Sequence, residues 1–376
     1  MLSAAAAWLN PVRTVRPLKS GDTVPNTPRD IATGTSRVEI GEHGLRLPRI
    51  GLGTASLGNF LGAVTDEQAV DTIRHARDRG IRYVDTAPLY GHGLAEQRVG
   101  SALRDTPRED LVISSKVGRL LRADAPRDES QYADGQPFYT DVPATGPVWD
   151  FTYDGVRTSL AESLDRLDLD RVDILHLHDP DDHYEQASST AYAALRDLRA
   201  KGTVKAIGAG MNRTPVLTRL VENCDLDVVL LAGRYTLLDQ GAMADLLPAC
   251  REHGTKVVVG GVFNSGILVD PSPQARYDYV PAAPAVIAKA ARIQAVCDRY
   301  DVPLAAAALQ FPLAHPQIAS VLVGARSLAE LDMDLSLLEV VIPDALWHDL
   351  RASGLLPEDV PVPVGPPATG LERTAR

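Results

Sequence analysis

Short apolar segments alternate along most of the chain with longer segments in which apolar positions recur every three or four residues. The first pattern is typical of buried strands and the second of amphipathic helices. We therefore expect strands at 50–53, 82–85, 111–116, 172–178, 204–208, 227–232, 256–260 and 319–323. We expect helices between them, at 65–79, 93–104, 153–167, 185–200, 214–222, 241–253, 284–310 and 327–338.

Two local signals refine this pattern near the start of the chain. Thr65 with Gln68 three residues later resembles a capping box, which predicts a helix beginning at Thr65. Val38–Ile40 and Leu45–Leu47 flank the run Gly41-Glu42-His43-Gly44, which predicts a short hairpin before the first strand–helix unit.

Eight strand–helix units predict an α/β fold with a parallel sheet. Val228-Val229-Leu230-Leu231 is apolar throughout, as expected for a parallel strand buried on both faces. A doubly wound sheet is the alternative, but its glycine-rich turn after the first strand lacks the third glycine in Gly51-Leu52-Gly53-Thr54-Ala55-Ser56. We therefore favour a (β/α)8 TIM barrel. Its long loops, Val117–Phe151 and Phe263–Pro281, would lie at the C-terminal face, where barrel active sites are found.

The chain divides into three expected parts: a flexible leader at 1–36, the barrel domain at 37–345, and a C-terminal helix and tail at 346–376. The leader lacks the basic start of a signal peptide, and no apolar run reaches the length of a membrane span. We therefore expect a cytoplasmic protein. The net charge of −11 argues against nucleic acid as a partner. The sequence does not indicate the oligomeric state.

Four polar residues follow three successive predicted strands. Asp85 and then Tyr90 follow the strand at 82–85, Lys116 ends the next strand, and His178 ends the one after. A tyrosine whose pKa is lowered by a nearby ammonium can exchange a proton with a substrate oxygen. We predict that Tyr90 is the general acid/base, that Lys116 lowers its pKa, and that Asp85 pairs with Lys116. His178 would orient the substrate oxygen. This chemistry needs no metal, but it needs a cofactor to carry hydride.

Each of these residues taken alone is more often structural, and alternatives remain. His176 shares a strand face with His178 and competes with it for the same role. Lys116 as a Schiff-base lysine would make the barrel an isomerase or aldolase, which leaves Tyr90 unexplained. A barrel that binds nucleotide without catalysis is the third possibility.

Several motifs in these segments resemble those of the aldo-keto reductase family. They are Leu47-Pro48-Arg49-Ile50-Gly51-Leu52-Gly53-Thr54, Asp85-Thr86-Ala87-Pro88-Leu89-Tyr90-Gly91, Glu96-Gln97-Arg98-Val99-Gly100, Asp173-Ile174-Leu175-His176-Leu177-His178-Asp179-Pro180 and Val323-Gly324-Ala325-Arg326-Ser327. Within the family, the chain resembles the bacterial L-fucose and D-threo-aldose 1-dehydrogenases and the pyridoxal 4-dehydrogenase. The resemblance implies a barrel that uses NAD or NADP and places the family's catalytic tetrad on Asp85, Tyr90, Lys116 and His178. It implies a small aldose, aldehyde or ketone as substrate, with a broad aldehyde or ketone reductase as the alternative.

The resemblance also implies cofactor contacts at Gly53, Thr54, Asn212, Phe263, Gly324, Ala325, Arg326, Ser327 and Glu330. Glu330 stands where NADP-preferring members have a basic residue, and a carboxylate there would repel the 2′-phosphate. The sequence therefore favours NAD, although Arg326 is close enough to compensate. The loop after Lys116 offers further possible substrate contacts, at Arg119, Tyr132, Phe138, Tyr139 and Trp149.

Overall fold

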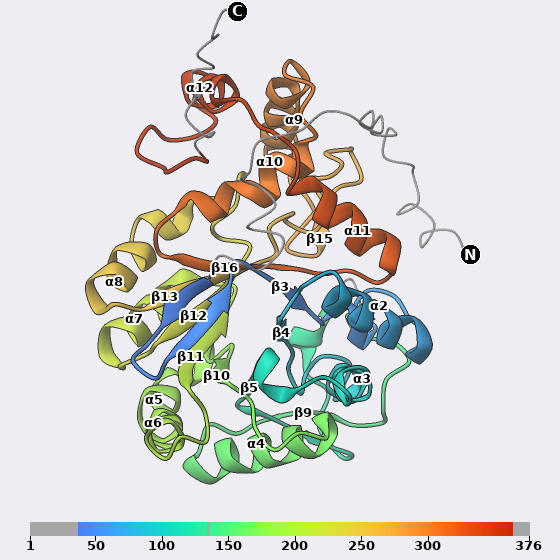
Figure 1. The fold of residues 1–376 in the computed structure, drawn as a ribbon, viewed down its shortest axis with the longest axis vertical. Helices are drawn as coiled ribbons and strands as arrows, with labels where there is room; N and C mark the ends of the chain where they lie inside the picture. The colour runs from blue at the N-terminus through green and yellow to red at the C-terminus, as the bar shows by residue number, and fades with distance from the viewer. Residues whose placement is uncertain (1–36, 134, 364–376) are drawn as a thin grey trace, which may run out of the picture.

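The computed structural model describes residues 37–133 and 135–363, so the predicted leader at 1–36 and the end of the tail, 364–376, lie outside the described residues. Eight parallel strands close into a barrel, in the order β10-β11-β12-β13-β16-β3-β4-β5 (Figure 1). These strands are β3 (Ile50–Gly53), β4 (Tyr83–Asp85), β5 (Val112–Val117), β10 (Ile174–His178), β11 (Ala206–Met211), β12 (Val228–Ala232), β13 (Lys256–Gly260) and β16 (Ile318–Val323). The predicted (β/α)8 barrel is confirmed.

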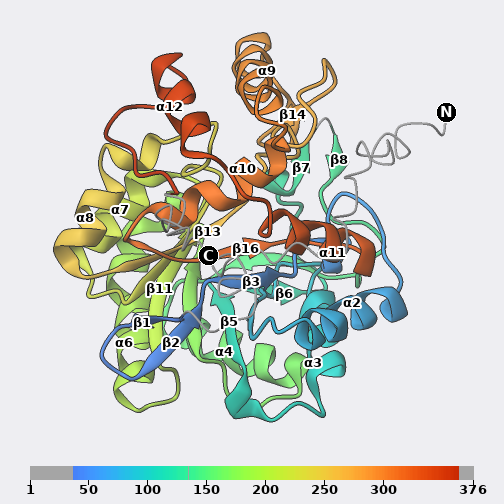
Figure 2. The same ribbon diagram turned by 45° about the horizontal axis from the view of Figure 1, so that its top comes forward.

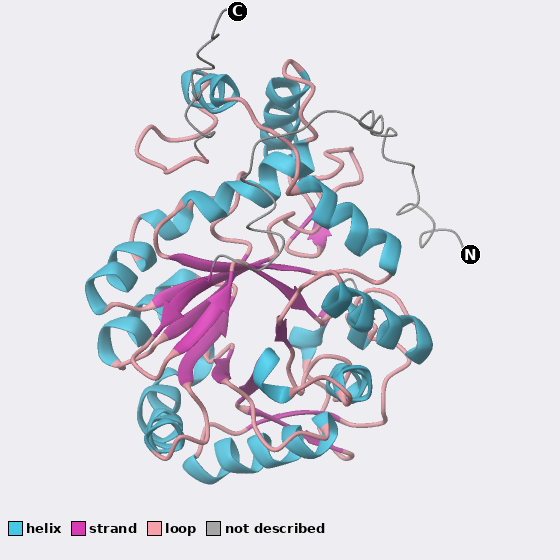
Figure 3. Ribbon diagram, viewed as in Figure 1, coloured by secondary structure: helices cyan, strands magenta, loops and turns pink. Residues whose placement is uncertain are grey.

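Helices surround this barrel, as the cyan and magenta layers of Figure 3 show. They are α2 (Asp66–Asp78), α3 (Leu94–Leu103), α4 (Tyr153–Leu167), α5 (Tyr184–Gln186), α6 (Tyr192–Ala200), α7 (Thr214–Asn223), α8 (Leu246–His253), α9 (Pro284–Asp298), α10 (Leu304–Gln310), α11 (Leu328–Leu337) and α12 (Asp344–Ala352). Buried apolar residues between strands and helices form one continuous core. No helix among the described residues is long and apolar enough to cross a membrane.

The helix predicted at 284–310 is two helices. α9 ends at Asp298, Asp301 takes a left-handed backbone conformation, and α10 begins after Pro303. Proline cannot continue a helix through its own position, because it lacks the N–H and its ring clashes with the preceding turn. The start of α2 follows the prediction in part: the Thr65 hydroxyl accepts from the Gln68 N–H, but the Gln68 side chain donates to the Arg326 carbonyl.

The predicted hairpin is formed by β1 (Arg37–Ile40) and β2 (Leu45–Pro48), and Figure 2 shows it lying across the barrel strands. Ile40, Leu45 and Leu47 pack in one cluster with Tyr83, Val112, Ile174, Ala206 and Val228. Those five residues begin or nearly begin their strands, so the hairpin closes the N-terminal end of the barrel. The opposite, C-terminal end is left for the site.

The two long loops carry short hairpins that the sequence does not predict. Val117–Phe151 contains two hairpins and Phe263–Pro281 contains one. They pair β6 (Arg119–Arg122) with β9 (Gly146–Trp149), β7 (Tyr132–Ala133) with β8 (Gln136–Pro137), and β14 (Arg276–Tyr277) with β15 (Val280–Pro281). Such two-residue to four-residue strands are too short for their periodicity to be visible in the sequence.

α12 belongs to the main core, because Leu346, Trp347 and Leu350 are buried in it. The helix begins at Asp344, so the boundary predicted after residue 345 falls inside it. The division of the chain into parts stays a prediction.

Candidate active site

Strands β4, β5 and β10 are neighbours in the barrel, and their carboxyl ends bring three of the predicted residues together. The Lys116 ammonium lies 2.7 Å from an oxygen of Asp85 and donates to the Thr86 carbonyl at 2.9 Å. The second Asp85 oxygen accepts from the Ser114 hydroxyl at 2.7 Å. Asp85 and Lys116 are only 2% and 1% exposed, so this ion pair is fully enclosed.

Tyr90 lies on the turn after β4 and faces this pair. The Lys116 ammonium is 4.5 Å from the centre of the Tyr90 ring, and the His178 ring meets the same tyrosine edge-on, with 5.9 Å between ring centres. The structure therefore places Asp85, Tyr90, Lys116 and His178 in one cluster. An ammonium already paired with a carboxylate is poorly suited to form a Schiff base, which disfavours the aldolase alternative.

Burial raises the pKa of the Tyr90 phenol well above its usual value, and Asp85 and Asp179 raise it further while Arg119 lowers it. Sequence reasoning predicted a lowered pKa, and this direction is wrong. The reason is physical: the Lys116 charge is compensated by Asp85 at 2.7 Å, so loss of hydration outweighs it. The phenol is protonated at neutral pH and has a proton to donate.

The two candidate histidines differ in their depth inside the barrel. His176 is fully buried, neither ring nitrogen has a hydrogen-bond partner, and burial followed by the Lys116 charge lowers its pKa to about 3. His178 is nearer the rim, and burial followed by Arg119 and Lys116 lowers its pKa well below the usual value. Both are neutral at neutral pH, and His178 is the one in contact with Tyr90.

The residues of the Glu96–Gly100 motif support the barrel wall. Glu96 is fully buried. Its carboxylate accepts from the Ser115 hydroxyl and pairs with Arg166. Arg98 donates to the Leu57 and Val64 carbonyls of the loop after β3. The motif therefore fixes α3 and the β3 loop against the strands that carry the site.

The predicted cofactor residues all follow strand ends at the same end of the barrel. Gly53 and Thr54 follow β3, Asn212 follows β11, Phe263 follows β13, and Gly324–Ser327 joins β16 to α11. Thr54 is fully buried and its hydroxyl donates to the Asp85 carbonyl, so it braces the strand end that carries Asp85. Asn212 is exposed and Phe263 is half-buried.

Small residues and a helix N-terminus lie together at the barrel mouth, at the ends of β13 and β16. A Cβ built on Gly260 or on Gly324 would make only ordinary van der Waals contacts, the nearest at 3.8 Å in each case. The N-terminus of α11, capped by Ser327, lies beside Gly324, and helix N-termini favour phosphate groups. Small residues beside a helix N-terminus are the kind of surroundings that a dinucleotide needs.

Glu330 and Arg326 interact with their own surroundings at this helix end. The Glu330 carboxylate accepts from the Arg326 backbone N–H at 2.8 Å. The Arg326 guanidinium donates to the Phe60 carbonyl at 3.1 Å.

Sequence reasoning missed Asp179, Phe60 and Tyr279, which lie at the same end of the barrel as Tyr90. Asp179 pairs with Arg119, while Phe60 and Tyr279 come from two loops and meet in an aromatic cluster with Phe138 and Tyr139. Asp179 directly follows His178 and was visible as part of its motif. Tyr279 lies in a long loop with no local signal. Tyr132, predicted as a possible substrate contact, stacks with Arg127 at the β7–β8 hairpin and not in this aromatic cluster.

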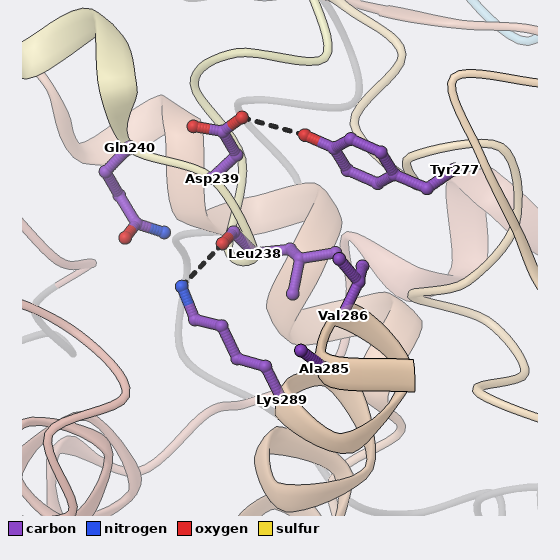
Figure 4. A pocket seen from close by; sticks show the side chains of 7 residues that line it. All are labelled: Leu238, Asp239, Gln240, Tyr277, Ala285, Val286 and Lys289. Atoms are coloured by element: carbon purple, nitrogen blue, oxygen red, sulfur yellow. Dashed lines mark hydrogen bonds between the residues drawn. The ribbon is translucent and has the colours of Figure 1, made fainter. Parts of the chain in front are cut away.

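A shallow pocket of about 270 Å³ lies between the loop after β12, β14 and α9 (Figure 4). Lys289 donates to the Leu238 carbonyl at 2.7 Å, and the Tyr277 hydroxyl donates to Asp239 at 2.8 Å. None of the predicted site residues lines it. These contacts brace the hairpin that carries Tyr279 toward the site.

Comparison with known proteins places this geometry in a family. Residues 49–354 match the Aldo/keto reductase family. The chain is 44% identical over 318 residues to a D-threo-aldose 1-dehydrogenase from Pseudomonas sp, covering 84% of this chain and 96% of that protein. It is 38% identical over 339 residues to a pyridoxal 4-dehydrogenase from Microbacterium luteolum, covering 84% and 97%. The fold is similar to that of a glycerol dehydrogenase from Gluconobacter oxydans, with a TM-score of 0.68, 22% identity, and coverage of 88% and 98%.

The chain is thus a (β/α)8-barrel enzyme with a cluster of ionisable side chains at the carboxyl ends of its strands. It belongs to the aldo/keto reductase family, as its motifs predict. It is an oxidoreductase that acts on a small-molecule substrate with a nicotinamide cofactor, NAD or NADP.

Proposed function

We propose that this protein is an aldose 1-dehydrogenase in which Tyr90 exchanges the proton with the substrate oxygen. The observation that supports this proposal most strongly is that the Tyr90 ring contacts both the ammonium of the Lys116–Asp85 pair and the ring of His178. The 44% identity to a D-threo-aldose 1-dehydrogenase supports the substrate class.

The proton chemistry follows from these four side chains. In oxidation, Tyr90 takes the proton of the substrate hydroxyl on the anomeric carbon. The electron pair of that O–H bond becomes the second bond of the lactone carbonyl. In reduction, Tyr90 donates its proton to the carbonyl oxygen. When bound, the nicotinamide accepts or returns the hydride of that same carbon. In this proposal the neutral His178 hydrogen-bonds the same oxygen, and the Lys116 ammonium beside the ring offsets part of the cost that burial and Asp85 impose on the phenolate left after proton donation.

We propose that the cofactor is held by the residues predicted from the motifs, Gly53, Thr54, Asn212, Phe263, Gly324, Ala325, Arg326, Ser327 and Glu330, with Thr54 acting through Asp85. We further propose a preference for NAD. Glu330 places a carboxylate at the start of α11. Negative charge at this end would repel the 2′-phosphate of NADP.

An aromatic aldehyde is the second candidate substrate. Phe60, Phe138, Tyr139 and Tyr279 form a cluster of rings close to Tyr90, and flat rings pack well against such surfaces. The 38% identity to a pyridoxal 4-dehydrogenase points the same way.

The test is turnover of purified protein, followed by the near-ultraviolet absorbance of the reduced nicotinamide, with NAD and NADP in turn. The panel holds aldoses, pyridoxal and simple aldehydes, each in both directions. Formation of NADH from an aldose is expected. The oxidation rate should rise with pH, because the phenol must first lose its proton. Turnover only of aldehydes, with no aldose oxidation, would reject the aldose assignment.

A further inference from the structure

Arg119, at the start of β6, is a buried cation next to the proton-transfer cluster. The residue is 4% exposed, and one guanidinium nitrogen donates to Asp179 at 2.7 Å. The guanidinium carbon lies 4.0 Å from the centre of the Trp149 ring. The ion pair and the indole together fix the guanidinium in one plane, which leaves its remaining N–H groups with defined directions.

Two nitrogens of this guanidinium, Nε and Nη1, are buried and have no hydrogen-bond partner. Native proteins satisfy nearly all buried polar groups, and a buried donor without a partner costs free energy. Arginine cannot avoid this cost by losing its proton. Two unpaired N–H groups on an enclosed cation therefore indicate that an acceptor from outside the chain completes this site.

The position of Arg119 relates this acceptor to the reacting carbon. Its partner Asp179 has an oxygen 3.6 Å from Nε2 of His178, which contacts Tyr90. The positive charge of Arg119 also lowers the pKa of both Tyr90 and His178. An acceptor on Arg119 would lie next to the substrate oxygen held by Tyr90 and His178.

The charge of the pair limits the chemistry of the ligand. Asp179 compensates Arg119, so the pair does not attract an anion as a lone arginine would. Asp179 has a left-handed backbone conformation, with φ of 44°, and its side chain is 30% exposed. Such strained residues concentrate at functional sites. A fixed double donor beside a partly exposed carboxylate suits neutral hydroxyl groups, which both accept and donate.

We propose that Arg119 is the specificity-determining residue of this enzyme. One of its unpaired N–H groups, Nε–H or Nη1–H, donates to the hydroxyl oxygen on the carbon next to the reacting carbon of a neutral polyhydroxylated substrate, and Asp179 accepts from a hydroxyl of the same substrate. This inference rests on the proposed function in one respect, namely that Tyr90 is the proton-transfer residue.

The experiment compares glyceraldehyde with propanal, two aldehydes of the same chain length that differ in their hydroxyl groups. Both are reduced by wild type, Arg119→Lys and Arg119→Met, and kcat and KM are measured separately. Lysine keeps a positive charge beside Asp179 but lacks the planar set of donors. We expect kcat/KM for glyceraldehyde to fall about 10- to 100-fold in both variants, and kcat/KM for propanal to change less than about threefold in Arg119→Lys, which keeps the charge beside Asp179.

Arg122→Lys is the matched control, because Arg122 lies on the same strand and pairs with Glu162 away from Tyr90. It should leave both substrates unaffected. The pH profile of propanal reduction should be the same in Arg119→Lys and wild type, which separates recognition of hydroxyls from an effect on His178.

Equal loss for both aldehydes in Arg119→Lys, or an unchanged ratio, would overturn the proposal, as would a wild type that does not reduce glyceraldehyde at all. The proposed function can fail separately. A wild type that oxidises no aldose, yet prefers glyceraldehyde through Arg119, would reject the aldose assignment and support this inference.

Discussion

Strands β4, β5 and β10 carry charged or ionisable side chains at or one residue before their ends, whereas β11, β12 and β13 carry small residues at or next to theirs. On the first side Asp85, Lys116 and His178 are enclosed. On the second side the strand ends are Gly210-Met211, Ala232-Gly233 and Gly260-Gly261. Proton transfer needs side chains fixed by partners, whereas a flat ligand needs room, and the mouth provides the two on opposite sides.

The largest effect is expected from breaking the ion pair on the charged side. Lys116→Met leaves Asp85 as an unpaired buried charge, which typically costs about 3–5 kcal/mol in the free energy of unfolding. Urea denaturation of the purified protein measures it. Adding Asp85→Asn should restore much of this stability without restoring activity. If Lys116→Met alone is as stable as wild type, the Lys116–Asp85 pair is hydrated and not enclosed.

The second prediction removes one hydroxyl on the same side. Tyr90→Phe should lower kcat at least ~10²-fold in both directions, the usual scale for a general acid/base. Tyr300→Phe is the matched control, because this hydroxyl donates to Asp349 far from the barrel mouth. Full activity in Tyr90→Phe would assign proton transfer to another group.

The third prediction uses the buried imidazole of His176. Its pKa of about 3 in the folded protein is below the value of about 6.5 expected when unfolded. Stability from the neutral form is complete above about pH 6.5 and is lost as pH falls toward 3, at up to ~1.4 kcal/mol per pH unit. Wild type should therefore lose about 2–3 kcal/mol more than His176→Leu between about pH 6.5 and 4.5. Parallel urea-denaturation curves would contradict this.

The fourth prediction compares two glycines of β11. A Cβ on Gly208 would lie 1.7 Å from the Val228 carbonyl oxygen, whereas one on Gly210 would meet nothing closer than 3.5 Å. Gly208→Ala should lose about 1–3 kcal/mol or more of unfolding free energy, and Gly210→Ala less than about 1 kcal/mol. Similar losses in thermal and urea denaturation would mean that the small-residue side is closely packed.

The smallest effect concerns cofactor choice. Glu330→Arg should shift the ratio of kcat/KM for NAD over NADP toward NADP by about tenfold, since a repulsive charge becomes an attractive one. Glu339→Arg, an exposed charge reversal beyond α11, is the control. An unchanged ratio in Glu330→Arg would remove Glu330 from the cofactor site.

The sequence by itself determined the barrel, the hairpin and the four-residue cluster. Strand periodicity is local, and residues at the ends of successive parallel strands must meet at one end of a closed sheet. Asp85, Lys116 and His178 are therefore brought together by chain order alone, and Tyr90 follows because its turn is short.

Only the tertiary structure decided what depends on distance between remote segments. Arg119 and Trp149 are thirty residues apart in one long loop and meet across the β6–β9 pair, Asp179 joins them from the end of β10, and Tyr279 reaches the aromatic cluster from a loop without periodicity. The sequence also predicted the wrong direction for the Tyr90 pKa shift, because that shift balances burial against charges whose distances the sequence does not contain.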